Sequence, residues 1–163
     1  MPRFIIVNEK DEIISYKNFD EIKTSDIYRV SALWVINSKG EILLAQRAFT
    51  KSHDPGKWGP AVAGTVEEGE TYKENIINEA EEELGLKELN LLVGQKKRVQ
   101  GKHNYFCQWF LLTIDRDITD FKIQEEEVAS IKWFAKEELL KKINENPKTF
   151  IPSMRKTVRL FLS

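Results

Sequence analysis

Cysteine and histidine are nearly absent from this chain. It has one cysteine, Cys107, and two histidines, His53 and His103. A single thiol cannot form an internal disulfide, which favours a reducing compartment, so we expect a cytoplasmic protein. Cys107 lies in an apolar segment and is interpreted as a packing residue. Because Zn²⁺ prefers nitrogen and sulfur ligands, the composition does not favour a zinc site.

Long apolar runs and an excess of one charge are also lacking. The longest clearly apolar runs, residues 32–36 and 109–112, are far too short to span a bilayer. The apolar stretch near the amino terminus ends at Val7, so we expect neither a membrane association nor a signal peptide. Lys plus Arg number 25 against 26 Asp plus Glu, a net charge of −1. This balance offers no overall field to attract a nucleic acid polymer, so the expected partner is a small molecule.

The chain is rich in acid in one segment, where a helix is predicted. Thr71, followed three residues later by Glu74, is a capping box that starts a helix at about Tyr72, and Gly85 ends it. A stripe of apolar residues at helical spacing is expected to face a core. Its members are Ile76, Ile77, Ala80 and Leu84.

Three carboxylates share a face of this helix beside the apolar stripe. Glu79, Glu82 and Glu83 have the spacing i, i+3, i+4, so their charges repel, by about 0.2–0.5 kcal/mol for each pair. The arrangement becomes favourable when a hard divalent cation collects the oxygens, and carboxylate oxygen suits Mg²⁺ or Mn²⁺. The alternative is an ordinary solvated acidic face, which fits Glu74 and Glu81.

The glycines that bound this segment give it a close resemblance to the box of the Nudix hydrolases. That box reads Gly, five residues, Glu, seven residues, Arg-Glu, a small or apolar residue, any residue, Glu-Glu, any residue, Gly and an apolar residue. It corresponds here to residues 64–86, with Gly64, Glu70, Glu79, Ala80, Glu82, Glu83, Gly85 and Leu86 at fixed positions. One position departs, because Asn78 stands where the family has arginine. The departure puts the catalytic rate in question more than metal binding.

The resemblance implies a metal-dependent hydrolase that cleaves the diphosphate linkage of a nucleoside diphosphate joined to another group. Glu79, Glu82 and Glu83 would then hold Mg²⁺ or Mn²⁺, with Gly64 letting the backbone approach the metal. Glu79 is favoured as base and ligand together, and Glu82 is the second catalytic candidate. Glu70 could orient the loop and the substrate, although a charge favourable near a helix N-terminus explains it equally well.

A second resemblance extends along nearly the whole chain, to the Nudix branch that contains isopentenyl-diphosphate isomerase and its hydrolase relatives. Arg47 and Lys51 match cations that hold a diphosphate in that branch, and Trp58 is counted with them as a substrate-binding residue. Isomerisation is disfavoured, because Ala63 and Thr65 replace the cysteine and the histidine that an isomerase requires. Within the run of three glutamates at 125–127, Glu126 is chosen as an extra carboxylate near the metal.

The expected fold is α/β (α+β): a Nudix-type α/β/α sandwich with a mixed central sheet and an N-terminal β-hairpin. Residues 1–163 form one domain, with an N-terminal hairpin extension at 1–28 and the Nudix box at 64–86. The hairpin offers an edge for a two-fold partner, so a homodimer is an option. The alternative function is a module that binds a nucleotide or diphosphate and turns it over slowly, because Asn78 replaces the arginine of the box. The leaving group cannot be read from the sequence.

Overall fold

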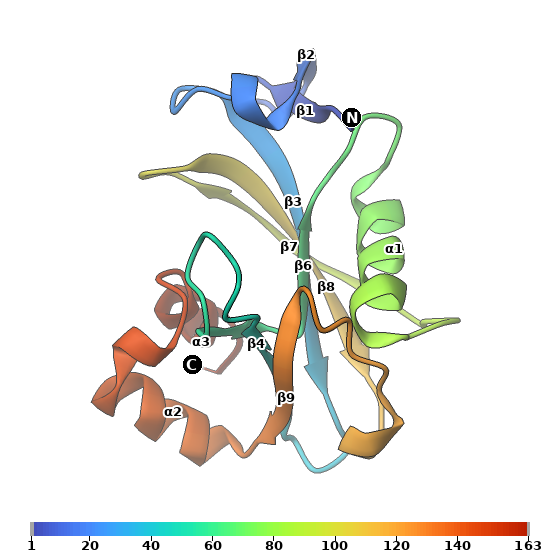
Figure 1. Ribbon diagram of the computed structural model, residues 1–163, viewed down its shortest axis with the longest axis vertical. Coiled ribbons are helices and arrows are strands. Elements are labelled where there is room, and N and C mark those ends of the chain that lie inside the picture. The colour runs from blue at the N-terminus through green and yellow to red at the C-terminus, as the bar shows by residue number, and fades with distance from the viewer. Residues whose placement is uncertain (1, 163) are drawn as a thin grey trace.

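The computed structural model describes residues 2–162, which form one mixed sheet flanked by helices on both faces (Figure 1). The strands of the described residues are Phe4–Val7 (β1), Ile13–Lys17 (β2), Ile27–Ile36 (β3), Ile42–Arg47 (β4), Trp58–Pro60 (β5), Val62–Thr65 (β6), Leu92–Val99 (β7), Asn104–Thr113 (β8) and Val128–Phe134 (β9). The helices are Tyr72–Leu84 (α1), Lys136–Glu145 (α2) and Met154–Leu162 (α3). The predicted mixed α+β architecture is confirmed.

Strand β3 is the centre of the sheet. It pairs with β8 in parallel along its whole length, and this is the parallel ladder that makes the sheet mixed. On its other edge β3 pairs antiparallel with β1, β6 and β4 in turn. A single strand therefore contacts both the hairpin β1–β2 and β6, the strand that leads into α1. β4 continues the sheet to β5 and β9.

Helix α1 begins and ends where the sequence predicts. The Thr71 hydroxyl accepts from the Glu74 N–H at 3.1 Å, and the Glu74 carboxylate accepts from the Thr71 N–H at 3.3 Å, which completes the capping box. Gly85 follows the last turn with a φ of 68°, a left-handed conformation that glycine adopts without steric cost. The helix that carries the acidic residues is therefore capped at both ends.

Two hydrophobic clusters lie on opposite faces of the sheet. One joins α1 to the sheet through Ile76, Ala80 and Leu84, all fully buried. The other joins α2 and α3 to the opposite face through Leu139, Met154 and other residues. Figure 1 shows α1 on one side of the sheet and the α2–α3 pair on the other. No helix within residues 2–162 is long and apolar enough to cross a membrane.

The predicted apolar stripe of α1 is wrong at one position. Ile77 is 38% exposed, whereas Asn75 is buried. The Asn75 amide donates to the Thr65 carbonyl and to the Glu70 carboxylate, both at 3.1 Å, and its oxygen accepts from the Ser31 hydroxyl. A polar residue is stable at this buried position because its hydrogen bonds are satisfied, and it ties α1 to β3 and to the preceding loop.

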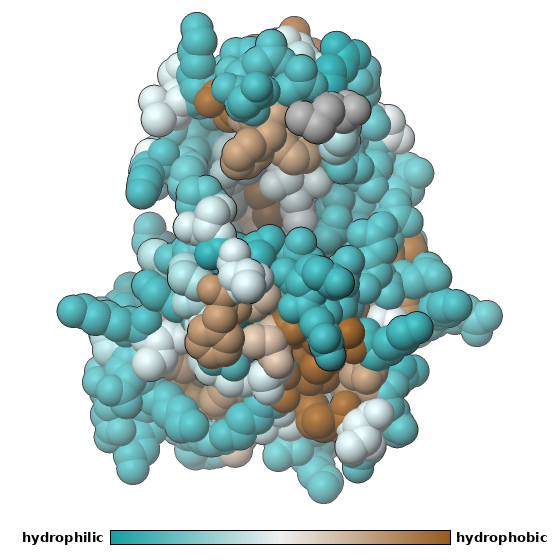
Figure 2. All heavy atoms as spheres, in the orientation of Figure 1, coloured by the Kyte–Doolittle hydropathy of each residue, from teal (hydrophilic) through white to brown (hydrophobic). Residues whose placement is uncertain are grey.

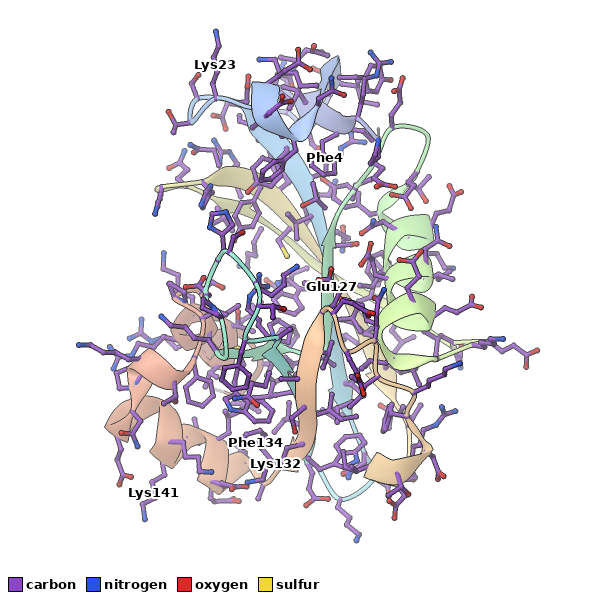
Figure 3. All side chains as sticks on the ribbon, viewed as in Figure 1. Phe4, Lys23, Glu127, Lys132, Phe134 and Lys141 are labelled. Carbon is purple, nitrogen blue, oxygen red and sulfur yellow. The ribbon has the colours of Figure 1, made fainter. Side chains whose placement is uncertain are left out.

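The N-terminal hairpin is fastened to the rest of the sheet by Asp11. Its carboxylate accepts from Arg29 at 2.8 Å, from Lys96 at 2.7 Å and from the Tyr72 hydroxyl at 2.9 Å. These three partners come from β3, β7 and α1. The hairpin therefore holds a fixed position, and Phe4 of β1 lies beneath it next to Glu67 (Figure 3).

Candidate active site

A cavity of about 390 Å³ opens between the sheet and the acidic face of α1. Its walls come from β4, β5, β6, α1 and the segment that enters β9, and Phe4 of the hairpin closes one end. The surface is hollowed beneath the hairpin in Figure 2. The charged residues that line the cavity are Glu67, Glu79, Glu82, Glu83, Glu127, Arg47 and Lys51. The structure thus gathers the three predicted helix carboxylates and the two predicted cations in one place.

Gly64 lies directly against the Glu79 side chain in this cavity. A Cβ atom at residue 64 would lie 2.7 Å from Cγ of Glu79 and 2.8 Å from its Cδ. Side-chain atoms do not approach so closely, so any larger residue would displace the Glu79 carboxylate. Glycine is required here for the space that it leaves.

Burial and mutual repulsion alter the acidity of two of the carboxylates. Burial, followed by the neighbouring charge of Glu82, raises the pKa of Glu79 to about 7. Burial, followed by the charges of Glu79 and Glu127, raises the pKa of Glu83 to about 8. Each carboxylate is costly to ionise in this cavity without a nearby positive charge.

One carboxylate oxygen of Glu83 is also left without a partner. Its Oε2 atom is buried and makes no hydrogen bond to any described residue. Such an atom costs about 1–3 kcal/mol unless something else coordinates it. The donor set is all oxygen, which suits Mg²⁺ or Mn²⁺. No group of three acidic, histidine or cysteine side chains among residues 2–162 is arranged as a ready metal-binding cluster.

Glu70 lies at the base of the site and organises the loop before α1. Its carboxylate accepts from the Glu67 N–H at 2.8 Å and from Asn75 at 3.1 Å. It also accepts from the side-chain amide of Asn78 at 3.0 Å. Glu70 does not line the cavity, so its contacts are those of a positioning residue. Asn78, which replaces the arginine of the box, still holds this carboxylate.

The cationic wall comes from the end of β4 and the loop that follows it. The Arg47 Nε–H donates to the His53 carbonyl at 3.0 Å, and the Lys51 ammonium pairs with Glu127. Figure 3 shows Glu127 at the start of β9, on the side that faces α1. Glu127 therefore links the cationic and acidic walls of the cavity.

Besides Glu70, two other residues predicted for the site lie outside this cavity. Glu126 is exposed, and the neighbouring Glu127 faces the cavity instead, because only one of the three consecutive glutamates points inward as the chain enters β9. Trp58 packs edge-on against Phe134, with ring centroids 5.3 Å apart, on the side that α2 covers. Alternation along β5 turns the indole away from the carboxylates. Lys51 and Glu127 are 76 residues apart in the sequence, so no local sequence pattern predicts their ion pair.

The chain matches the family model for the NUDIX domain over residues 27–154. The chain belongs to the Nudix family. Among curated Nudix relatives, an uncharacterised Nudix hydrolase of Listeria monocytogenes is 27% identical over 141 residues, covering 85% of this chain and 83% of the relative. The uncharacterised Nudix hydrolase YfcD of Salmonella typhi is 28% identical over 160 residues, covering 97% and 83%.

Solved Nudix structures share the fold. The crystal structure of DR0079 from Deinococcus radiodurans matches 99% of both chains with a TM-score of 0.85 and 23% identity. The Nudix domain of NrtR from Shewanella oneidensis, solved in complex with ADP ribose, matches 87% of this chain and 89% of that one, with a TM-score of 0.64 and 13% identity. At these identities the likeness concerns the fold alone, and this Nudix chain has the same layered arrangement.

Proposed function

We propose that this Nudix protein is a divalent-metal-dependent hydrolase that cleaves the diphosphate linkage of a nucleoside diphosphate joined to another group. The proposal rests on one observation: a single cavity has an acidic wall and a cationic wall. Glu79, Glu82 and Glu83 of α1 form the acidic wall. Arg47 at the end of β4 and Lys51 in the following loop form the cationic wall. A diphosphate is anionic, so it needs positive charge on both sides. Arg47 and Lys51 provide that charge on one side, and cations held by the glutamates provide it on the other.

The residues fit a metal on the acidic side. The unpartnered Oε2 of Glu83 and the raised pKa values of Glu79 and Glu83 all reflect carboxylates that lack a compensating cation. Glu79, Glu82 and Glu83 would hold Mg²⁺ or Mn²⁺, and the absence of a side chain at Gly64 leaves space beside Glu79. When bound, a divalent ion neutralises the diphosphate oxygens and makes the phosphorus easier to attack.

Residues of the chain itself then position the substrate and remove a proton from the attacking water. The Arg47 guanidinium can bind two phosphate oxygens at once, and the Lys51 ammonium adds a point charge. Glu79 accepts the proton of the attacking water, because its carboxylate lines the cavity beside the other two helix glutamates and opposite Arg47 and Lys51. Glu82 is the second candidate for this role. Glu70 acts on these groups through the loop that it orders.

The finer family placement is also part of this proposal. Arg47 and Lys51, which suggested the isopentenyl-diphosphate isomerase branch, line the same cavity as the glutamates. Ala63 and Thr65 line it too, at the positions where an isomerase needs reactive side chains. Neither can add or remove a proton at carbon, so we retain hydrolysis as the reaction of this branch member.

A panel assay tests the proposal against the alternative of a binding module. Nucleoside diphosphate sugars, dinucleoside polyphosphates, ADP ribose and nicotinamide dinucleotides are incubated with Mg²⁺ or Mn²⁺, and released phosphate and mononucleotides are quantified. We expect turnover of at least one class, its loss in EDTA, and its loss in Glu82→Gln. Glu81→Gln is the matched control, because Glu81 lies outside the cavity. Binding without turnover across the panel would identify a module instead.

A further inference from the structure

A second cavity, of about 520 Å³, adjoins the acidic one. The two cavities share three lining residues, Pro60, Ala63 and Ile151. A molecule whose diphosphate occupies the acidic cavity can therefore extend past Ala63 into the second one. The volume lies within the range of about 300–1,000 Å³ that is typical of small-molecule sites.

The floor of the second cavity is apolar and aromatic. It is formed by strands β3 and β8 and by α3. Ala32, Cys107 and Trp109 are buried there, and Tyr105 stacks on Tyr28 with ring centroids 5.5 Å apart. Burial raises the pKa of the Cys107 thiol to about 12, so this thiol stays protonated and acts as an apolar surface. A planar or apolar group gains more from such a floor than a bare sugar, whose hydroxyls would lose water.

The rim of the second cavity is positively charged. Its lining includes Lys97, Arg98, Lys156 and Arg159, and none of its lining residues within 2–162 is acidic. Arg98 is engaged by the Glu9 carboxylate at 2.9 Å. Lys97 and Lys156, both exposed, make no ion pair with any residue that the structure describes. Two unpaired ammonium groups above an apolar floor favour a ligand that has a negative charge of its own.

We propose that this second cavity binds the nucleoside part of the substrate, and that this nucleoside bears a phosphate beyond the diphosphate that is cleaved. The base lies on the floor formed by Tyr105, Trp109 and Cys107, and the additional phosphate lies between Lys97 and Lys156. This assignment rests on the proposed hydrolase function for the place of the diphosphate. It deepens that function by naming a substrate class, the nucleotides with an additional sugar phosphate.

The proposal is tested by calorimetry with product-like probes that have no diphosphate linkage. The probes are the 3′,5′-bisphosphates and the 5′-monophosphates of adenosine, guanosine, cytidine and uridine, titrated in Mg²⁺ at low salt. For at least one base we expect the bisphosphate to bind about three- to tenfold more tightly, the range that two exposed ion pairs supply. The preference should shrink as salt is added.

Two variants test whether the preference for the bisphosphate depends on the cationic rim. The double variant Lys97→Ala, Lys156→Ala should reduce the preference to less than twofold. Lys141→Ala, on the far side of α2 (Figure 3), should retain it in full. Equal binding of both probes for all four bases overturns the proposal, and so does a preference that persists in the double variant. Because the probes are not hydrolysed, the two proposals can fail separately. A preference for the bisphosphate in a protein that hydrolyses neither the panel nor diphosphate compounds whose nucleoside carries an additional 2′- or 3′-phosphate would refute the hydrolase function alone.

Discussion

Gly64 and Glu79 are in such close contact that even a methyl group on residue 64 would lie 2.7 Å from the Glu79 side chain. We predict that Gly64→Ala lowers kcat by about 10²-fold, because the Glu79 carboxylate must move and small displacements at a reacting centre cost this much. The helix and its caps are untouched, so thermal unfolding should change little.

Gly40→Ala provides the contrasting control for Gly64→Ala. Gly40 has a φ of 78° with open space around it. Alanine there strains the β3–β4 turn and should lower the melting temperature while leaving kcat unchanged at permissive temperature. If Gly64→Ala loses activity only in proportion to its loss of folded protein, the close contact with Glu79 has no catalytic importance.

The raised pKa of Glu83 predicts how the stability of the metal-free protein depends on pH. Its pKa rises from 4.5 to about 8 on folding, so the unfolded chain loses this proton first as the pH increases. The contribution of Glu83 is therefore most favourable below pH 4.5 and declines as the pH approaches 8. Calorimetric scans of metal-free protein between pH 5 and 8.5 should show a falling melting temperature over this interval.

Glu83→Gln should flatten that pH dependence. The amide keeps the shape of the carboxyl without a charge, so at pH 8 we expect the variant to be more stable than the metal-free parent by about 1–3 kcal/mol. Added Mn²⁺ should stabilise the parent far more than the variant. Identical pH profiles for parent and variant would show that Glu83 is not the buried acid.

The adjacent residues Glu126 and Glu127 form a matched pair. Glu127 lines the cavity and pairs with Lys51, whereas Glu126 is exposed. We predict that Glu127→Gln raises the Kd for Mn²⁺ by about tenfold, because it removes one negative charge from the cavity that the α1 glutamates line. Glu126→Gln should behave as the parent. Equal effects of the two substitutions would contradict the placement of Glu127 in the cavity and of Glu126 at the exposed surface.

Asn78 is one of three hydrogen-bond donors that hold the Glu70 carboxylate. Its side-chain amide donates to Glu70 at 3.0 Å. Removing it with Asn78→Ala should lower kcat about three- to tenfold, with a smaller effect on metal affinity, because one hydrogen bond to a charged group is lost. Asn78→Arg restores the residue of the box and should equal or exceed the parent rate. Steady-state kinetics measure the effect on kcat, and Mn²⁺ titrations measure the effect on metal affinity. If neither Asn78→Ala nor Asn78→Arg changes either quantity, position 78 has no role in catalysis.

Local sequence signals predicted the acidic helix well. The capping box and Gly85 set the bounds of α1, because these features depend on residues close together in the chain. Mixed sheet pairing was expected, but the central place of β3 follows from contacts distant in sequence.

The candidate site could be predicted only in part. The spacing of Glu79, Glu82 and Glu83 placed them on one helical face, and the structure brings that face to the cavity. Burial of Asn75 in place of Ile77 depends on a hydrogen bond from Ser31, which lies on a different element. The inward turn of Glu127 likewise depends on how β9 meets β4. Periodicity identifies a face, but the neighbouring element decides what that face contacts.

The measurement that tests the account most directly is anomalous diffraction from crystals soaked with Mn²⁺ and a non-hydrolysable nucleoside diphosphate analogue. We predict a manganese peak about 2.0–2.3 Å from carboxylate oxygens of Glu79, Glu82 and Glu83, with the diphosphate between that peak and Arg47. A peak at any other place, or a diphosphate bound away from α1, would contradict it.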